Sequence, residues 1–485
     1  MFAARANILR ATYQIPNWKD VMREEFSIDL EADSTPRTNF LASGRAYIYG
    51  DLTQYEDNYV AIAIAIRNHK SLEKFVTSMN PDLEVKQLKH FKYLVKNKSL
   101  LGWSNNLLVL LDARQSPNES HLTDIFAKIA DNPRDSSLLF TNENFRQALN
   151  SYYDVSLWVN MNDLGKSSLF NTFAQNVNLD QNYLHLHANF DEGQITTRTK
   201  YFANDTLYQR YADILSRPID RKLIEHVPLQ DPAVLLGMSL KSDGFKQLLA
   251  DLSLTEKCSN LANAVTLSLD DFFEMISGDI VIALKDLSHL DQDLDKSDSA
   301  TAFKDKKTLS DLVMGAGIKN EAVYDSLIQV LTETGILEQK DGYQEFFGEI
   351  FIMKKDSMVF FTKNESIKDD FLEGIKLQDE NILSMSTNNW FMLYANESIS
   401  EKTVKGQDLI TEITRNLLKN ENLLIDKAKV TFSVPNAQTG GESIILFKDK
   451  NANSLLAMLE VLKEIVFQTK LRLDPNYYSG VDSMD

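Results

Sequence analysis

The sequence predicts an α+β fold in which mixed or mostly antiparallel sheets are covered on one face by helices. Two sequence patterns predict this fold class, and the chain length predicts more than one domain. Short alternating strand patterns cover Tyr47–Tyr49, Val60–Ile66 and Leu107–Leu111, and helical patterns separate pairs of such strands. Strands that follow one another in pairs favour antiparallel pairing. A chain of 485 residues exceeds one ordinary core, so two or more domains are expected.

The first predicted element is a strand at the very start of the chain. Its segment Ala6-Asn7-Ile8 aligns best with Ser239-Leu240-Lys241, but the lead-in at residues 227–234 has no counterpart before it. We therefore expect the natural protein to extend upstream of Met1 and its first strand to be truncated here. A signal peptide or a lipid-attachment cysteine would lie in that upstream part.

Similar sequence blocks then recur in the same order, which predicts a tandem duplication. The clearest pair of blocks begins at Gly193 and at Gly441, an offset of 441 − 193 = 248 residues. Each block consists of a glycine turn, a β-rich run, a polar break and a helical pattern. The matched blocks are residues 43–52 with 277–287, 60–76 with 312–328, 104–115 with 354–366, 156–163 with 391–398, and 193–215 with 441–462. The predicted copies are residues 1–225 and 226–485, joined by a connector containing Pro218, Pro228 and Pro232.

The second copy contains an acidic insertion near residues 288–308. In copy one, the matched residues Leu52 and Val60 are 60 − 52 = 8 residues apart. Their counterparts in copy two, Leu287 and Leu312, are 312 − 287 = 25 residues apart. Asp291, Asp293, Asp295 and Asp298 follow one another there at near-alternate positions, as at the start of a calcium-binding loop. Position six of such a loop would be Lys296 rather than glycine, and position twelve would be Ala302 rather than glutamate. A solvated surface loop is therefore favoured over a calcium site.

Two histidines in "YLHLHANF" form the other candidate metal site. His185 and His187 alternate along a predicted strand, so their side chains point to the same face. Two imidazoles at this spacing hold zinc if a third ligand comes from elsewhere, and the sequence identifies none. Histidines on an exposed strand face are the favoured interpretation.

The segment "DVSLWVNMNDLGKSSLF" has the layout of a nucleotide-binding phosphate loop but lacks its first glycine. Asn160 stands five residues before Gly165, where G-x-x-x-x-G-K-[S/T] requires glycine. We therefore interpret Lys166 as part of a polar helix start. The single cysteine, Cys258, is expected to be a small packed helix residue, and it allows no internal disulfide.

Composition restricts the possible partners. The net charge of −18 repels phosphate backbones, so nucleic acid is not expected. No run of about 18 apolar residues predicts a membrane span. The sequence contains neither G-x-S-x-G nor H-E-x-x-H, and Trp18, Trp103, Trp158 and Trp390 are expected in the core rather than in a sugar-binding platform.

Several phrases carry a family resemblance, among them "GRAYIYGDL", "LLGWSNNLLVLLDARQ" and "LSLDDFFEMISGDIVIALKDL". With them the chain resembles, over nearly its whole length, the Bacteroidetes-type family of exported proteins known as domain of unknown function 4836. The shared motifs are strand cores and helix starts. The resemblance implies secretion or lipid anchoring at the cell envelope, implies no enzymatic activity, and supplies no functional residues to match.

The expected function is therefore non-enzymatic binding by a cell-envelope protein, through the junction between the copies or the acidic loop. The alternatives are a hydrolase whose active site is assembled from distant segments, and an envelope scaffold. The expected partner is an envelope protein or a small ligand, with membrane contact only through an upstream lipid anchor. No cofactor is expected apart from calcium. The expected location is exported, periplasmic or lipid-anchored in the outer membrane, with the cytoplasm as the alternative.

Overall fold

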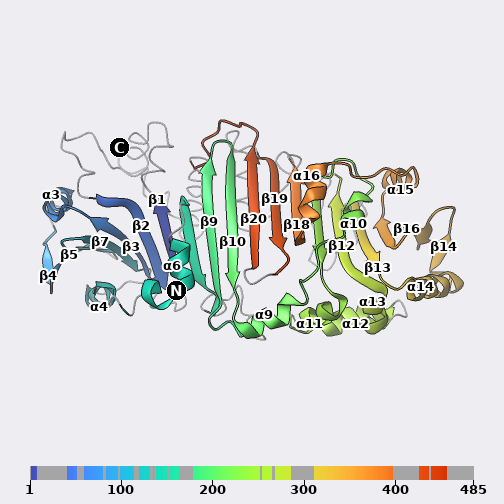
Figure 1. Cartoon of the computed structure of the whole chain (residues 1–485), viewed down its shortest axis with the longest axis horizontal. Coiled ribbons are helices and arrows are strands. Elements are labelled where there is room, and N and C mark those ends of the chain that lie inside the picture. The colour runs from blue at the N-terminus through green and yellow to red at the C-terminus, as the bar shows by residue number, and fades with distance from the viewer. Residues whose placement is uncertain are drawn as a thin grey trace, which may run out of the picture. The chain divides into compact units, whose positions relative to one another are not determined.

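The computed structural model divides the chain into two compact units, each with its own helices and its own antiparallel strands (Figure 1). Unit 1 consists of Met1–Phe190 and Thr199–Asn204, and unit 2 of Asp191–Arg198 and Asp205–Asp485. The structure describes residues 2–7, 41–51, 59–79, 83–96, 99–113, 119–130, 135, 138–149, 153–162, 178–251, 254–264, 268–285, 311–396, 425–435 and 439–455. The predicted α+β class is confirmed. The predicted boundary between the copies, at residues 225 and 226, stays a prediction.

In unit 1 the strands pair in the order β9, β8, β1, β2, β3, β7, β6, β5, β4, and each of these pairings is antiparallel. The first strand of the chain therefore lies inside the sheet, between β2 and β8. The three predicted strand segments fall within β2, β3 and β7. The strands are β1 (Phe2–Asn7), β2 (Leu41–Asp51), β3 (Tyr59–Ile66), β4 (Lys86–Leu88), β5 (Phe91–Lys96), β6 (Ser99–Trp103), β7 (Leu107–Ala113), β8 (Val155–Asn160) and β9 (Tyr183–Asp191), followed by β10 (Gln194–Phe202).

Helices cover both faces of the unit 1 sheet, so the prediction that they cover one face is wrong. Helix α4 buries Leu122 and Phe126 against Val109 of β7, whereas α3 buries Leu72 in a separate cluster that includes Leu108. Because neighbouring residues of a strand point to opposite faces, the two helices lie on opposite faces. The described helices of this unit are α3 (His69–Met79), α4 (Glu119–Ala130), α5 (Leu138–Thr141) and α6 (Glu143–Leu149).

In unit 2 the strands pair in the order β20, β19, β18, β11, β12, β13, β17, β16, β15, β14, again antiparallel in every described pair. From β19 to β14, this order is that of unit 1 with ten added to each strand number. The strands are β11 (Val234–Ser239), β12 (Ile276–Leu284), β13 (Leu312–Ile318), β14 (Leu337–Gln339), β15 (Gln344–Phe346), β16 (Ile350–Lys355), β17 (Met358–Thr362), β18 (Asn389–Asn396), β19 (Ile425–Ser433) and β20 (Thr439–Phe447).

Helices also lie on both faces of the unit 2 sheet, which is a second correction to the one-face prediction. Phe360 of β17 packs with Leu223 of α10 and Ile367 of α15, whereas its neighbour Val359 packs with Phe273 of α13 and Leu331 of α14. The described helices are α9 (Asp205–Ala212), α10 (Arg221–Glu225), α11 (Ser242–Asp251), α12 (Thr255–Ala264), α13 (Leu269–Met275), α14 (Glu321–Glu333), α15 (Glu365–Leu372), α16 (Glu380–Leu383) and the 3-10 helix η4 (Ser384–Ser386).

A buried carboxylate fixes the chain segment that leads into α10. Asp279 of β12 is 2% exposed, and its Oδ2 accepts hydrogen bonds from the Arg217 guanidinium (2.6 Å) and the Ser277 hydroxyl (2.9 Å). Its Oδ1 accepts one from the backbone N–H of Asp220 (3.2 Å). The residue before it, Gly278, has φ +95°, a left-handed conformation in which a side chain would be strained. The "SGD" phrase thus ends a turn and anchors a loop.

Among the described helices of both units, none has the length and apolar character that crossing a bilayer requires.

Candidate functional site

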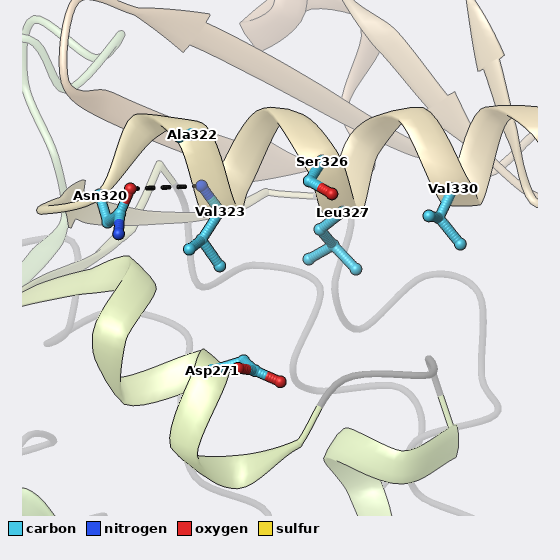
Figure 2. A pocket seen from close by; sticks show the side chains of 7 residues that line it. All are labelled: Asp271, Asn320, Ala322, Val323, Ser326, Leu327 and Val330. Carbon is cyan, nitrogen blue, oxygen red and sulfur yellow. Dashed lines mark hydrogen bonds between the residues drawn. The ribbon is translucent and has the colours of Figure 1, made fainter.

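Helices α13 and α14 of unit 2 form the two walls of an open groove (Figure 2). Both helices begin at side-chain caps. Ser268 accepts a hydrogen bond from the N–H of Asp271 (3.0 Å) and donates one to its carboxylate (2.6 Å), so the cap and the third helical residue stabilise one another. The Oδ1 of Asn320 accepts a hydrogen bond from the N–H of Val323 at 3.3 Å and starts α14.

The inner face of α14 fixes this wall of the groove in place. Tyr324 and Leu331 are buried in the core shared with α13 and β17, and burial raises the pKa of the Tyr324 hydroxyl to about 12. Lys354 of β16 lies 5.1 Å from the Tyr324 ring and pairs with Glu321 and Asp325 on the flank of α14. The groove wall is therefore formed before any ligand arrives.

A direct hydrogen bond also ties the two helices together. The Nδ2 of Asn320 donates to Oε1 of Glu274, on α13, at 2.9 Å. The cap of α14 thus holds both its own first turn and the neighbouring helix. This bond sets the spacing of the groove walls at one end.

The groove has a volume of about 460 Å³. Val323 and Leu327 point from α14 into the space beside α13, with Ser326 between them along the helix, and Val330 lies further along α14 (Figure 2). Asp271 lies on α13, across that space. Asn320 and Ala322 complete the lining. Val330 is 41% exposed, although it is a large apolar side chain.

The lining combines apolar and polar side chains. It offers an apolar stripe of three branched side chains, one carboxylate, one amide and one hydroxyl. Among the residues that the structure describes, the lining includes no histidine, cysteine or lysine. The arrangement can bury apolar side chains and accept a hydrogen bond or a positive charge at Asp271.

The predicted histidine pair lies elsewhere, on β9 of unit 1. His185 and His187 are buried (3% and 4% exposed), so the interpretation of an exposed strand face is wrong. The ring of His187 stacks on Tyr153 at 3.5 Å between centroids, and His185 lies 6.1 Å from the ring of Trp158. Aromatic rings from neighbouring segments cover this face of the strand, which is why a polar row is buried.

The predicted histidine site gains no third ligand among the residues that the structure describes. There, no group of three or more His, Cys, Asp or Glu side chains is placed to hold a metal ion. The acidic residues of the calcium hypothesis, Asp291, Asp293, Asp295 and Asp298, lie outside the described residues, as does Lys166 of the phosphate-loop segment. The zinc and calcium assignments stay predictions.

The tryptophans and the cysteine can be placed more directly. Trp103 and Trp158 are in the core, as predicted, Trp390 is half-buried, and Trp18 lies outside the described residues. Cys258 is in α12 and packs against the core that α13 and α14 share, which agrees with a small packed helix residue.

Sequence reasoning missed the groove altogether. Asp271 and Val330 are 330 − 271 = 59 residues apart, and only the packing of α13 against α14 brings their segments together. The available signal was Val330 itself, since the helical pattern of 321–333 assigns Tyr324 and Leu331 to the core and leaves an apolar residue beside that face.

Comparisons with known proteins give one family match and several distant structures. The family model described as "Domain of unknown function (DUF4836)" matches residues 43–420. Crystal forms IV, I and III of TP0453 are 8%, 7% and 9% identical to this chain. They cover 43%, 42% and 45% of it and 79%, 75% and 84% of their own chains, each with a TM-score of 0.26, which is too low to establish a shared fold. No curated protein matches.

Proposed function

The chain belongs to the family described as domain of unknown function DUF4836, and we propose that it is a non-enzymatic binding module that docks a segment of a partner protein in the α13–α14 groove. One observation carries this proposal. Val330, 41% exposed, continues the apolar stripe of Val323 and Leu327 along a preformed, open groove. Burying such a stripe against a partner stabilises the complex by about 25 cal/mol per Å² of apolar surface removed from water.

The shape of the groove favours a chain segment over a small molecule. Small-molecule sites are clefts or cavities that bury roughly 70–90% of the ligand surface, with lining residues on several sides. The lining of this groove instead comes almost entirely from α14 and its cap, and Ala322 and Val330 are eight residues apart, about 12 Å at 1.5 Å per residue. A segment lying along α14 can use this length, whereas a compact ligand would stay largely exposed.

Photocross-linking in the native host tests the proposal. A photoreactive amino acid replaces Ser326, which lines the groove, or Thr332, which is exposed on the same helix about 120° away around its axis. We expect a discrete protein adduct from position 326 and none of the same mass from position 332. Adding Val330→Asp should abolish the adduct, because the carboxylate would have to be buried unpaired in the complex.

The proposal fails if both positions give the same adducts, or if the adduct at position 326 survives Val330→Asp in a protein whose circular dichroism is unchanged. Thr332→Asp is the matched control, since it adds the same charge on the same helix. We expect this control to leave the adduct from position 326 in place.

We also propose that the two units arose by tandem duplication. The supporting observation is the strand order, which from β9 to β4 and from β19 to β14 is the same after ten is added to each strand number. The matched sequence blocks include corresponding strands: residues 43–51 lie on β2 and 277–284 on β12, and residues 156–160 lie on β8 and 391–396 on β18. Separate expression of both units, with comparison of their backbone structures, tests this proposal.

The predicted export to the cell envelope belongs to the proposed function. The sequence resemblance described above, which implies an exported protein, is what supports it. Fractionation of the native host tests it: recovery in the cytosolic fraction alone would contradict it.

A further inference from the structure

We propose, on the basis of the binding function assigned above, that the partner segment is a basic amphipathic helix. The α13–α14 groove presents an apolar stripe and an acidic rim on adjacent surfaces. These two features together recognise a helix with one apolar face and lysines or arginines at its border.

The apolar stripe sets the length and spacing of the partner segment. Val323, Leu327 and Val330 are four and three residues apart, so they form one row along α14. An apolar row on a partner helix repeats with the same three- and four-residue spacing and can pack against this row over about two turns. A volume of about 460 Å³ accommodates a few large side chains, not a whole domain.

Carboxylates form the rim on the α13 side. Asp271 lines the groove, and Glu274, one turn further along α13, is bonded to Asn320 at the groove's end. The nearby Asp270 already pairs with Lys246, and Lys354 already pairs with Glu321 and Asp325. Lys319 is a further cation of this region and is exposed at the residue before the α14 cap.

Electrostatics therefore favours a cationic partner over an anionic one. Asp271 is exposed beside the apolar stripe, and its Oδ2 accepts a hydrogen bond from the Ser268 hydroxyl. The whole chain carries a net charge of −18, which attracts basic partners over longer range and repels acidic ones. An acidic or phosphorylated segment would meet like charges at the rim.

Synthetic helical peptides of about four turns test this inference, because no partner needs to be known. One peptide carries leucines at i, i+3, i+4 and i+7 with lysines at the flanking positions, a second has glutamates in place of the lysines, and a third has the lysines but scrambled leucines. Binding to the full chain is measured by fluorescence anisotropy at low and moderate salt. We expect the lysine peptide to bind at least tenfold more tightly than either of the others.

Variants of the protein separate specific docking from general attraction to an acidic surface. Asp271→Asn together with Glu274→Gln should weaken the lysine peptide about three- to tenfold and reduce its salt dependence. Val330→Asp adds a negative charge, so non-specific attraction would strengthen binding, whereas docking in the groove predicts a loss of at least tenfold. Thr332→Asp, with the same added charge away from the groove, should leave the affinity within twofold.

The outcomes distinguish failure of the basic-helix proposal from failure of the proposal that the groove binds a partner. Equal binding of the lysine and glutamate peptides, or tighter binding after Val330→Asp, overturns the basic-helix assignment. If the cross-link at position 326 forms while the lysine peptide shows no preference, the groove binds a partner of other chemistry. If neither cross-link nor peptide binding is seen, both proposals fall.

Discussion

Replacing Arg217 by methionine should destabilise unit 2 by about 1.5–3 kcal/mol. The substitution keeps much of the apolar stem and removes the guanidinium from Asp279, a carboxylate that is 2% exposed. Hydrogen bonds to charged groups contribute about 1.5–3 kcal/mol each, and breaking a fully buried ion pair costs about 3–5 kcal/mol. Arg217 is itself 42% exposed, so water screens this pair and the lower range applies.

The carboxylate does not lose every partner in this variant. The Ser277 hydroxyl and the Asp220 N–H still donate to it, at 2.9 and 3.2 Å. Asp279→Asn removes the charge but keeps an acceptor for the Asp220 N–H, so we expect a cost of about 1–2 kcal/mol. In the double variant no carboxylate is left without its cation. The two costs should therefore combine to less than their sum, by about 1–2 kcal/mol.

Hydrogen-exchange mass spectrometry on the full chain measures these costs locally. Peptides covering β12 report its opening free energy, and a loss of 1.5–3 kcal/mol corresponds to roughly 10- to 150-fold faster exchange. Arg221→Met is the matched control, because Arg221 pairs at 2.6 Å with Glu380, which is 70% exposed. We expect no measurable change in β12 exchange from the control.

Two results would refute the reasoning. Exchange in β12 that is less than threefold faster in Arg217→Met would mean that the guanidinium contributes little to the buried carboxylate. Additive costs in the double variant would mean that Arg217 and Asp279 act on stability independently, despite the 2.6 Å contact.

Three further predictions concern stability. Gly278→Ala should prevent stable folding of unit 2, because the new Cβ would lie 1.7 Å from the carbonyl oxygen of Leu240. Gly335→Ala should cost only about 1 kcal/mol, because that glycine also has a positive φ (+72°) but no neighbour within 4 Å of the new Cβ. Urea titrations measure the free energy of unfolding of both variants. The hydrogen bond from Lys86 lowers the pKa of the Glu119 carboxyl below 4.5. The stabilisation that this ion pair gives is therefore present above that pH and is lost as the pH falls. Lys86→Met should reduce the drop in Tm between about pH 7 and pH 3, and an unchanged drop would contradict this reasoning. Lys368 is 9% exposed, and its Nζ lies 5.0 Å from the rings of Tyr343 and Phe351. Lys368→Ala should cost about 1–3 kcal/mol, and Lys368→Met clearly less, because methionine keeps much of the apolar part of the side chain. Equal Tm values for the two variants would exclude a contribution from that apolar part.

The strands were predictable because their apolar patterns are local. Val60–Ile66 and Leu107–Leu111 fall within β3 and β7 as expected. The two-sided helix cover was also signalled, since "LLVLLDA" and "MVFFT" are nearly continuous apolar runs, which indicate strands buried on both faces. The one-face prediction gave too much weight to the alternating strands and too little to these runs.

The histidines and the groove depend on contacts that no single segment reveals. In "YLHLHANF" the alternation is correct, but the polar row is covered by Tyr153 and Trp158, which come from outside the strand. The groove needs α13 and α14 to pack in one particular register, which is set by buried residues such as Phe273 and Leu331. Tertiary packing therefore decides both sites, and sequence patterns decide only the elements.

The central position of the first strand in unit 1 has a consequence for synthesis on the ribosome. β1 pairs with β2 and also with β8. The pairing with β8 cannot form until the ribosome has synthesised β8, which begins at Val155, 155 − 7 = 148 residues after β1 ends at Asn7. At roughly 5–20 residues per second, that interval is roughly 7–30 s of translation. During it, one edge of β1 offers unpaired N–H and C=O groups to any other chain. β11 is in the same situation between β12 and β18. Efficient production of this protein should therefore depend on chaperones that shield nascent strand edges, and faster translation should raise the yield of folded chains.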